Sequence, residues 1–177
     1  MENVILCGCS SAESRIANSF AEYATVQYFG EGGLWRRGEK KKQITVYQVS
    51  QFPKTENFPA VLVLGSELKE QKNPLPPLLV PVFDSSSNRA AQILSLTGGP
   101  AISCGTSPRD TFSLASISEQ KTVVSLQRSL HTLAGNEIEP RDITIRLCRH
   151  CSVFETMAFC AVMLLCDVGC EQDLKLV

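Results

Sequence analysis

Short uninterrupted apolar segments, each followed by a glycine or an aspartate, are the feature that most constrains how this chain can fold. The clearest is residues 60–64 (AVLVL), which precede Gly65. Residues 4–7, 80–83 and 100–104 form further segments of this kind. Strands covered on both faces read as continuous apolar segments, and such strands are typical of parallel sheets. We therefore expect a mostly parallel central sheet.

Two segments have the pattern of helices that could cover this sheet. Ser10 and Glu13 have capping-box spacing, and apolar residues follow them at helical intervals. A second helix is expected over residues 90–94, with its N-cap among residues 85–88 and its end near Gly98.

The last third of the chain has a different pattern. Residues 122–133 and 138–147 read as antiparallel strands around a turn at Gly135 and Asn136, because apolar and polar residues alternate in the second strand. The apolar segment 153–166 predicts a buried helix. The order of elements predicts a three-layer α/β fold with a mostly parallel central sheet, an antiparallel hairpin extension and a C-terminal buried helix.

Length and charge limit the classes of function. The 177 residues are expected to form a single α/β domain over residues 1–177, since domains typically span about 100–200 residues. A net charge of −1 leaves no field for binding nucleic acid or an anionic membrane. The longest apolar stretch, residues 157–166, is shorter than the roughly 20 residues of a membrane span. Eight cysteines, several within apolar segments, and no signal peptide predict a reduced cytoplasmic protein.

Residues 36–42 (RRGEKKK) form the most charged segment of the chain. We interpret this segment as the solvated tip of a β-hairpin, because short charged turns are common. A phosphate-binding patch is the alternative, although Trp35 is the only aromatic residue beside these charges.

Ligands of open α/β sheets bind beyond the carboxyl ends of the strands, where three turns of this chain are expected. The first, residues 8–11, invites comparison with the phosphate-binding P-loop, G-x-x-x-x-G-K-[ST]. Counting from Gly8, the chain has Glu13, Ser14 and Arg15 where that motif needs glycine, lysine and a hydroxyl. Glu13 would also compete with phosphate for the positive end of the helix. An ordinary capped helix is therefore expected here.

The other two turns carry the candidate ligand-binding residues. A carboxylate, hydroxyls and an amide at a strand end could hold a ribose or a polar head group, but the same residue types also form helix caps and Asx-turns. The candidates are Asp84, Ser85, Ser86 and Asn88 in the second turn, and Gly105, Thr106 and Asp110 in the third, which spans residues 105–111.

No catalytic residue, metal site or cofactor is predicted. An attacking Cys104 would need a base, and His131 and His150 are both distant in sequence, so a buried strand cysteine is the better interpretation. Cys148 and Cys151 have C-x-x-C spacing, which supplies two of the four ligands of a structural zinc site.

Residues 80–170 resemble the second half of the central, nucleotide-binding domain of Mur ligases, the ATP-dependent amide-forming enzymes of peptidoglycan synthesis. The resemblance rests on a strand ending at Asp84, a short helix, a strand ending at Gly105, a hairpin, and Arg149-His150-Cys151 before an apolar helix.

This resemblance implies that Asp84 stands near the adenine or ribose of a nucleotide and that His150, a further candidate, approaches the nucleotide from the other side. Cys151 replaces an asparagine of the family, Ser85 replaces its second aspartate, and the P-loop is missing. Without a lysine-bearing phosphate cradle, ATP-driven ligation has little electrostatic support.

We therefore predict a Mur-ligase-like module without a P-loop that is non-catalytic and binds a protein partner or a second copy of itself. Leu34 and Trp35, beside the basic segment, could form part of that contact. The alternative is a protein that binds a nucleotide or a small polar ligand through the turns at residues 84–88 and 105–111.

Overall fold

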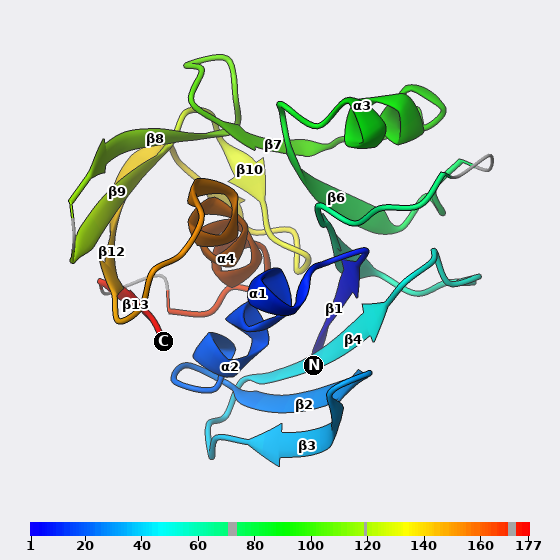
Figure 1. Ribbon diagram of the computed structural model, residues 1–177, viewed down its shortest axis with the longest axis horizontal. Helices are drawn as coiled ribbons and strands as arrows, with labels where there is room; N and C mark the ends of the chain where they lie inside the picture. The colour runs from blue at the N-terminus through cyan, green and yellow to red at the C-terminus, as the bar shows by residue number, and fades with distance from the viewer. Residues whose placement is uncertain (71–73, 119, 170–172) are drawn as a thin grey trace.

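The computed structural model describes residues 1–70, 74–118, 120–169 and 173–177 (Figure 1). Its strands are β1 (Glu2–Cys7), β2 (Thr25–Gly30), β3 (Gly33–Arg37), β4 (Gln43–Val49), β5 (Ala60–Leu64), β6 (Leu79–Asp84), β7 (Ile102–Gly105), β8 (Phe112–Ile117), β9 (Lys121–Leu126), β10 (Leu130–His131), β11 (Glu137–Ile138), β12 (Arg141–Leu147) and β13 (Leu174–Leu176). Its helices are α1 (Ser11–Ser14), α2 (Ile16–Phe20), α3 (Asn88–Ser95) and α4 (Val153–Leu165).

Eleven strands form one sheet in the order β13-β12-β9-β8-β7-β6-β5-β1-β4-β2-β3. All neighbours from β8 through β2 are parallel, whereas β8, β9 and β12 pair antiparallel. The predicted mostly parallel sheet with an antiparallel extension is therefore confirmed.

The sheet curls around α4, whose position inside the curl is visible in Figure 1. Twelve of the thirteen residues of α4 are buried, as expected for a helix that is apolar on all sides. Phe159 of α4 stacks on Phe20 of α2, with ring centroids 5.6 Å apart. The predicted C-terminal buried helix is confirmed, and α4 with the inner face of the sheet forms the larger core.

Helix α3 covers the opposite face of the sheet and completes the three layers (Figure 1). Ala90 and Ile93 of α3 pack in a second, smaller core with Ile5 of β1 and Leu62 of β5. Ser87 is the N-cap of α3, within the predicted residues 85–88, because its side chain accepts the Ala90 backbone N–H.

The helix expected after Ser10 is divided in two. α1 ends at Ser14 and α2 begins at Ile16. The hydroxyl of Ser14 donates to the Ser10 carbonyl at 2.9 Å, a local bond that competes with the helical pattern. Serine and asparagine are frequent in this segment and lower its helix propensity.

The basic segment is not the tip of a hairpin, which corrects our interpretation. The tight turn lies at residues 30–33, and β3 pairs antiparallel with β2 along its whole length. The chain then crosses to β4 on the other side of β2, so Arg36 and Arg37 belong to the edge strand β3. Strands β8 and β13 were not predicted, and the turn at residues 135–136 joins the short strands β10 and β11 instead of β9 and β12.

The sheet edge at β13 is covered by side chains from the segment of α2. The Ser19 hydroxyl accepts the Val177 backbone N–H at 3.0 Å and donates to the Val177 carbonyl at 2.9 Å. The Tyr23 hydroxyl accepts the Lys175 backbone N–H at 2.5 Å. These hydroxyls satisfy main-chain groups that an edge strand would otherwise leave open. Among the helices within the described parts of the chain, none is long and apolar enough to cross a membrane.

We expect Phe159→Ala to destabilise the protein by about 3–5 kcal/mol, because it removes a fully buried ring that stacks on Phe20. Urea unfolding followed by circular dichroism measures this loss. Leu96→Ala, at a half-exposed position, is the control and should change stability by less than about 0.5 kcal/mol. Equal effects of the two substitutions would contradict the central role of α4.

Candidate functional site

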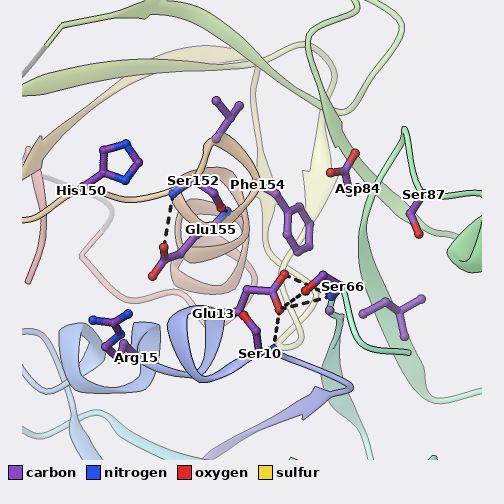
Figure 2. Close-up of a pocket in the computed structure, with 13 residues that line it drawn as sticks. Ser10, Glu13, Arg15, Ser66, Asp84, Ser87, His150, Ser152, Phe154 and Glu155 are labelled. Carbon is purple, nitrogen blue, oxygen red and sulfur yellow. Dashed lines mark hydrogen bonds between the residues drawn. The ribbon is translucent and has the colours of Figure 1, made fainter. Parts of the chain in front are cut away.

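A cavity of about 710 Å³ opens at the carboxyl ends of β1, β5 and β6, beside the N-terminus of α4 (Figure 2). In the strand order, the chain runs from β1 past β4 to β2, toward the edge at β3. From β5 it runs to β6, in the opposite direction, toward the edge at β13. Open α/β sheets bind ligands at such a switch point. The lining residues are Ser10, Glu13, Arg15, Leu64, Gly65, Ser66, Asp84, Ser87, His150, Ser152, Val153, Phe154 and Glu155.

The carboxylate of Glu13 joins the turn after β1 to the loop after β5. Its Oε2 accepts the Ser10 backbone N–H at 2.6 Å, the Ser66 hydroxyl at 3.0 Å and the Ser66 backbone N–H at 3.2 Å. The Ser10 hydroxyl accepts the Glu13 N–H at 3.3 Å, so the predicted capping box is confirmed. Glu13 is only 9% exposed. A buried carboxylate thus occupies donors of the kind that a P-loop directs at phosphate.

The same two loops are in direct backbone contact. Gly8 has a φ of 59°, and a Cβ at this position would lie 2.8 Å from the Leu68 backbone. A Cβ on Gly65 would lie 2.4 Å from the Cα of Cys9. The Glu67 N–H donates to the Gly8 carbonyl at 2.7 Å. Both positions therefore require glycine, and main chain fills the space between the loops.

The second turn combines local bonds with exposure to the cavity. Asp84 Oδ1 accepts the backbone N–H of Ser86 at 2.8 Å and its hydroxyl at 2.6 Å, which is an Asx-turn. Asp84 and Ser87 nevertheless line the cavity (Figure 2). The local bonds engage Oδ1 of the carboxylate, and Oδ2 accepts no hydrogen bond from any residue in the described ranges.

The third turn packs against the second one. A Cβ on Gly105 would lie 2.2 Å from Ser85 Oγ and 2.3 Å from Asp110 Oδ2, so these three residues pack closely. Asp110 is 5% exposed and accepts the Ser107 N–H at 3.1 Å. Of the eight predicted residues, Asp84 and His150 line the cavity. Six are not among its lining residues: Ser85, Ser86, Asn88, Gly105, Thr106 and Asp110.

Arg15 and His150 are the two basic side chains that line the cavity. Both residues are exposed, and neither side chain makes a hydrogen bond or ion pair with another residue in the described ranges. Figure 2 draws them on one side of the cavity, with Asp84, Ser66 and Ser87 on the other. A ligand in the cavity therefore meets hydrogen-bond donors at one end and a carboxylate with hydroxyls at the other.

The N-terminus of α4 is closed by its own side chains. The Ser152 hydroxyl accepts the Glu155 N–H at 3.0 Å, and Glu155 accepts the Ser152 N–H at 3.4 Å, which completes a capping box. Arg149 donates to the buried Glu155 carboxylate. Burial lowers the pKa of Arg149, but the hydrogen bond and charge of Glu155 outweigh this effect, so its pKa is raised. Glu155 is thus engaged in a structural ion pair.

Several lining residues were not predicted from the sequence. Ser152 and Glu155 have capping-box spacing before an apolar helix, so the sequence did carry a signal for them. Ser66 follows a strand that the sequence identified, and its place at a carboxyl end could have been inferred. Arg15 carried no such signal, because its position depends on the break between α1 and α2.

The seven cysteines in the described part of the chain give no support to a nucleophile or metal site. Cys104 is fully buried, and burial raises its pKa well above the ordinary value. Burial also raises the pKa of Cys7 to about 12. Cys148 is exposed and Cys151 is buried, and no cluster of three or more ligating side chains occurs in the ranges that the structure covers. The interpretation of Cys104 as a buried strand cysteine is confirmed.

We expect iodoacetamide at about pH 8 to modify Cys148 rapidly and to leave Cys7 and Cys104 unmodified in the folded protein. The latter two thiols are shielded and remain protonated, because their raised pKa values lie above this pH. Peptide mapping by mass spectrometry identifies the modified residue. Labelling in urea is the control, and rapid labelling of Cys104 without urea would contradict its burial.

We expect Glu13→Ala to cost about 1–3 kcal/mol, because it leaves the N–H groups of Ser10 and Ser66 without their carboxylate partner. Urea unfolding measures the change. The matched control is Glu22→Ala at an exposed position, with an expected change below about 0.5 kcal/mol. A Glu13→Ala protein as stable as the control would mean that the carboxylate contributes nothing to joining the loops.

No protein-family model matches this chain, and no curated protein matches it. The resemblance of residues 80–170 to the Mur ligase central domain therefore stays a prediction.

Proposed function

We propose that this protein is a non-catalytic module that binds a small polar ligand without a polyphosphate group in the cavity at the ends of β1, β5 and β6. A volume of about 710 Å³ lies within the range of small-ligand sites, about 300–1,000 Å³. This function combines two predictions from the sequence: that the protein is non-catalytic, and that it binds a small polar ligand.

The position of Glu13 carries this proposal. Its carboxylate uses the N–H groups of Ser10 and Ser66 that could otherwise bind an anion. A phosphate about 4 Å from this carboxylate would be repelled by about 4 kcal/mol per unit charge at an effective dielectric constant of about 20. Arg15 alone, exposed and in water, offsets little of that repulsion.

The opposed polar groups favour a ligand class. Asp84 and Ser87 can accept from hydroxyl or amino groups, whereas Arg15 donates to a carbonyl or a single carboxylate. Leu64 at the end of β5, together with Val153 and Phe154 at the N-terminus of α4, provides apolar surface for a ring. Nucleosides, sugars and amino acids have this chemistry.

We also propose that the chain is related to Mur ligases, and the composition of the cavity supports this proposal. Asp84 and His150, which the resemblance implies lie on two sides of a nucleotide, both line one cavity although 66 positions separate them. This common location is the arrangement expected if residues 80–170 share the family's architecture without its P-loop.

A thermal-shift panel tests the proposal with adenosine, uridine, amino acids and monosaccharides against Mg²⁺-ATP. A member of the phosphate-free set present at 100 times its Kd should stabilise the protein by about 2.7 kcal/mol. This corresponds to a Tm increase of roughly 5–10 °C for a domain of this size. Mg²⁺-ATP should produce no increase.

The variants Arg15→Met and Asp84→Asn should each reduce the ligand-induced shift, since both side chains line the cavity. Asn88→Ala is the matched control, because Asn88 is exposed and is not among the lining residues. The proposal fails if the whole phosphate-free panel leaves Tm unchanged, or if Mg²⁺-ATP binds and is turned over.

A further inference from the structure

The two edge strands of the sheet, β13 and β3, differ in whether other residues cover their outer main-chain groups. The Ser19 and Tyr23 hydroxyls cover the main chain of β13, as described above. Strand β3 pairs with β2 on one side, and no described strand pairs with its other side. Leu34 in β3 is 75% exposed. An unpaired edge with an exposed apolar residue is a template for another strand.

Strand β3 has a regular conformation that several side-chain contacts support. Its five residues pair with β2 without a register shift. Trp35 stacks on Tyr28 with ring centroids 4.9 Å apart, and the guanidinium of Arg37 lies 4.9 Å from the Trp35 ring on its own strand. Arg37 also donates to the Asn18 side chain at 2.9 Å. An edge ordered in advance loses little conformational entropy when another strand adds to it.

The charges beside this edge are mostly positive. Residues 36–42 carry five basic side chains and one acid, Glu39, in a chain whose net charge is −1. Lys42 forms an ion pair with Asp167 at 3.0 Å. Arg36, Lys40 and Lys41 are exposed, and none of them forms an ion pair with a residue placed by the structure. This segment is therefore complementary to an acidic partner.

A second copy of the chain fits this edge less well. Pairing two β3 edges would place Arg36 and Arg37 of one copy near the same residues of the other, and like charges at short range still repel at physiological salt. An acidic strand instead gains main-chain hydrogen bonds and favourable charge pairs at the same time.

We propose that the free edge of β3 binds an extended acidic segment of a partner protein by β-strand addition. Main-chain groups of β3 supply affinity, and the side chains supply selectivity. Leu34 and Arg36 lie on one face of the strand because side chains alternate, so the partner presents an apolar residue beside Leu34 and acidic residues beside Arg36 and the lysines.

The test uses three seven-residue peptides and the fluorescence of Trp35, which is the only tryptophan of the chain. The first peptide has glutamate, valine, valine and glutamate at its odd positions and threonine between them, so that one face carries both acidic and apolar side chains. The second peptide has lysine in place of both glutamates, and the third is the first with alternate amides methylated. We expect saturable binding of the acidic peptide alone, weakened at least about tenfold between about 50 mM and about 300 mM salt. Methylation should abolish binding, because it removes the main-chain donors.

The double variant Arg36→Glu and Lys41→Glu should weaken acidic-peptide binding at least about tenfold and keep Trp35 as the probe. Lys121→Glu, an exposed charge reversal on β9, is the control and should bind normally. Asp84→Asn should also bind normally, because Asp84 lines the cavity and lies on β6, far from β3 in the strand order, which separates this edge from the cavity.

Three results would overturn the proposal: no binding of the acidic peptide, equal binding of the lysine peptide, or equal binding of the methylated peptide. Sedimentation that shows a dimer lost in the Arg36→Glu and Lys41→Glu variant would overturn it as well, since the edge would then belong to a second copy.

Discussion

Helix α4 has no polar side, and the sheet surrounds it for that reason. A helix apolar on all faces is stable in water only when neighbours cover every face. The sheet supplies most of this cover by curling, and α2 closes the remaining gap through Phe20 and the contact with Phe159. The same packing brings β13 against the segment of α2, where Ser19 satisfies its main chain.

Burial of α4 also determines where the cavity lies. The N-terminus of the helix meets the carboxyl ends of β1, β5 and β6, and its capping box with the Arg149–Glu155 ion pair closes that end of the helix. Glu13 closes the neighbouring loops in a similar way. Two carboxylates thus satisfy helix and loop N–H groups from within the protein, and the remaining polar groups face the cavity.

The cavity and the β3 edge are formed by different parts of the chain. The cavity joins loops from distant elements and needs the close approach of the Gly8 and Gly65 backbones. The edge depends on a single hairpin, β2–β3, and on the basic residues that follow it. Arg15, which lines the cavity, also lines a second hollow together with Trp35 and Arg37 of β3, so the two surfaces are neighbours.

The sequence by itself determined the local features of this protein. Continuous apolar segments identified β1, β5, β6 and α4, and capping chemistry placed Ser10, Glu13 and the start of α3, because burial on both faces and helix caps are local requirements. The tertiary structure decided which turns meet. Asp84 and His150 share a cavity while Asp110 packs behind it, and Arg36 lies on an edge strand instead of a hairpin tip. Strand order causes both outcomes, and it depends on contacts between residues far apart in the chain, which spacing along the sequence does not encode.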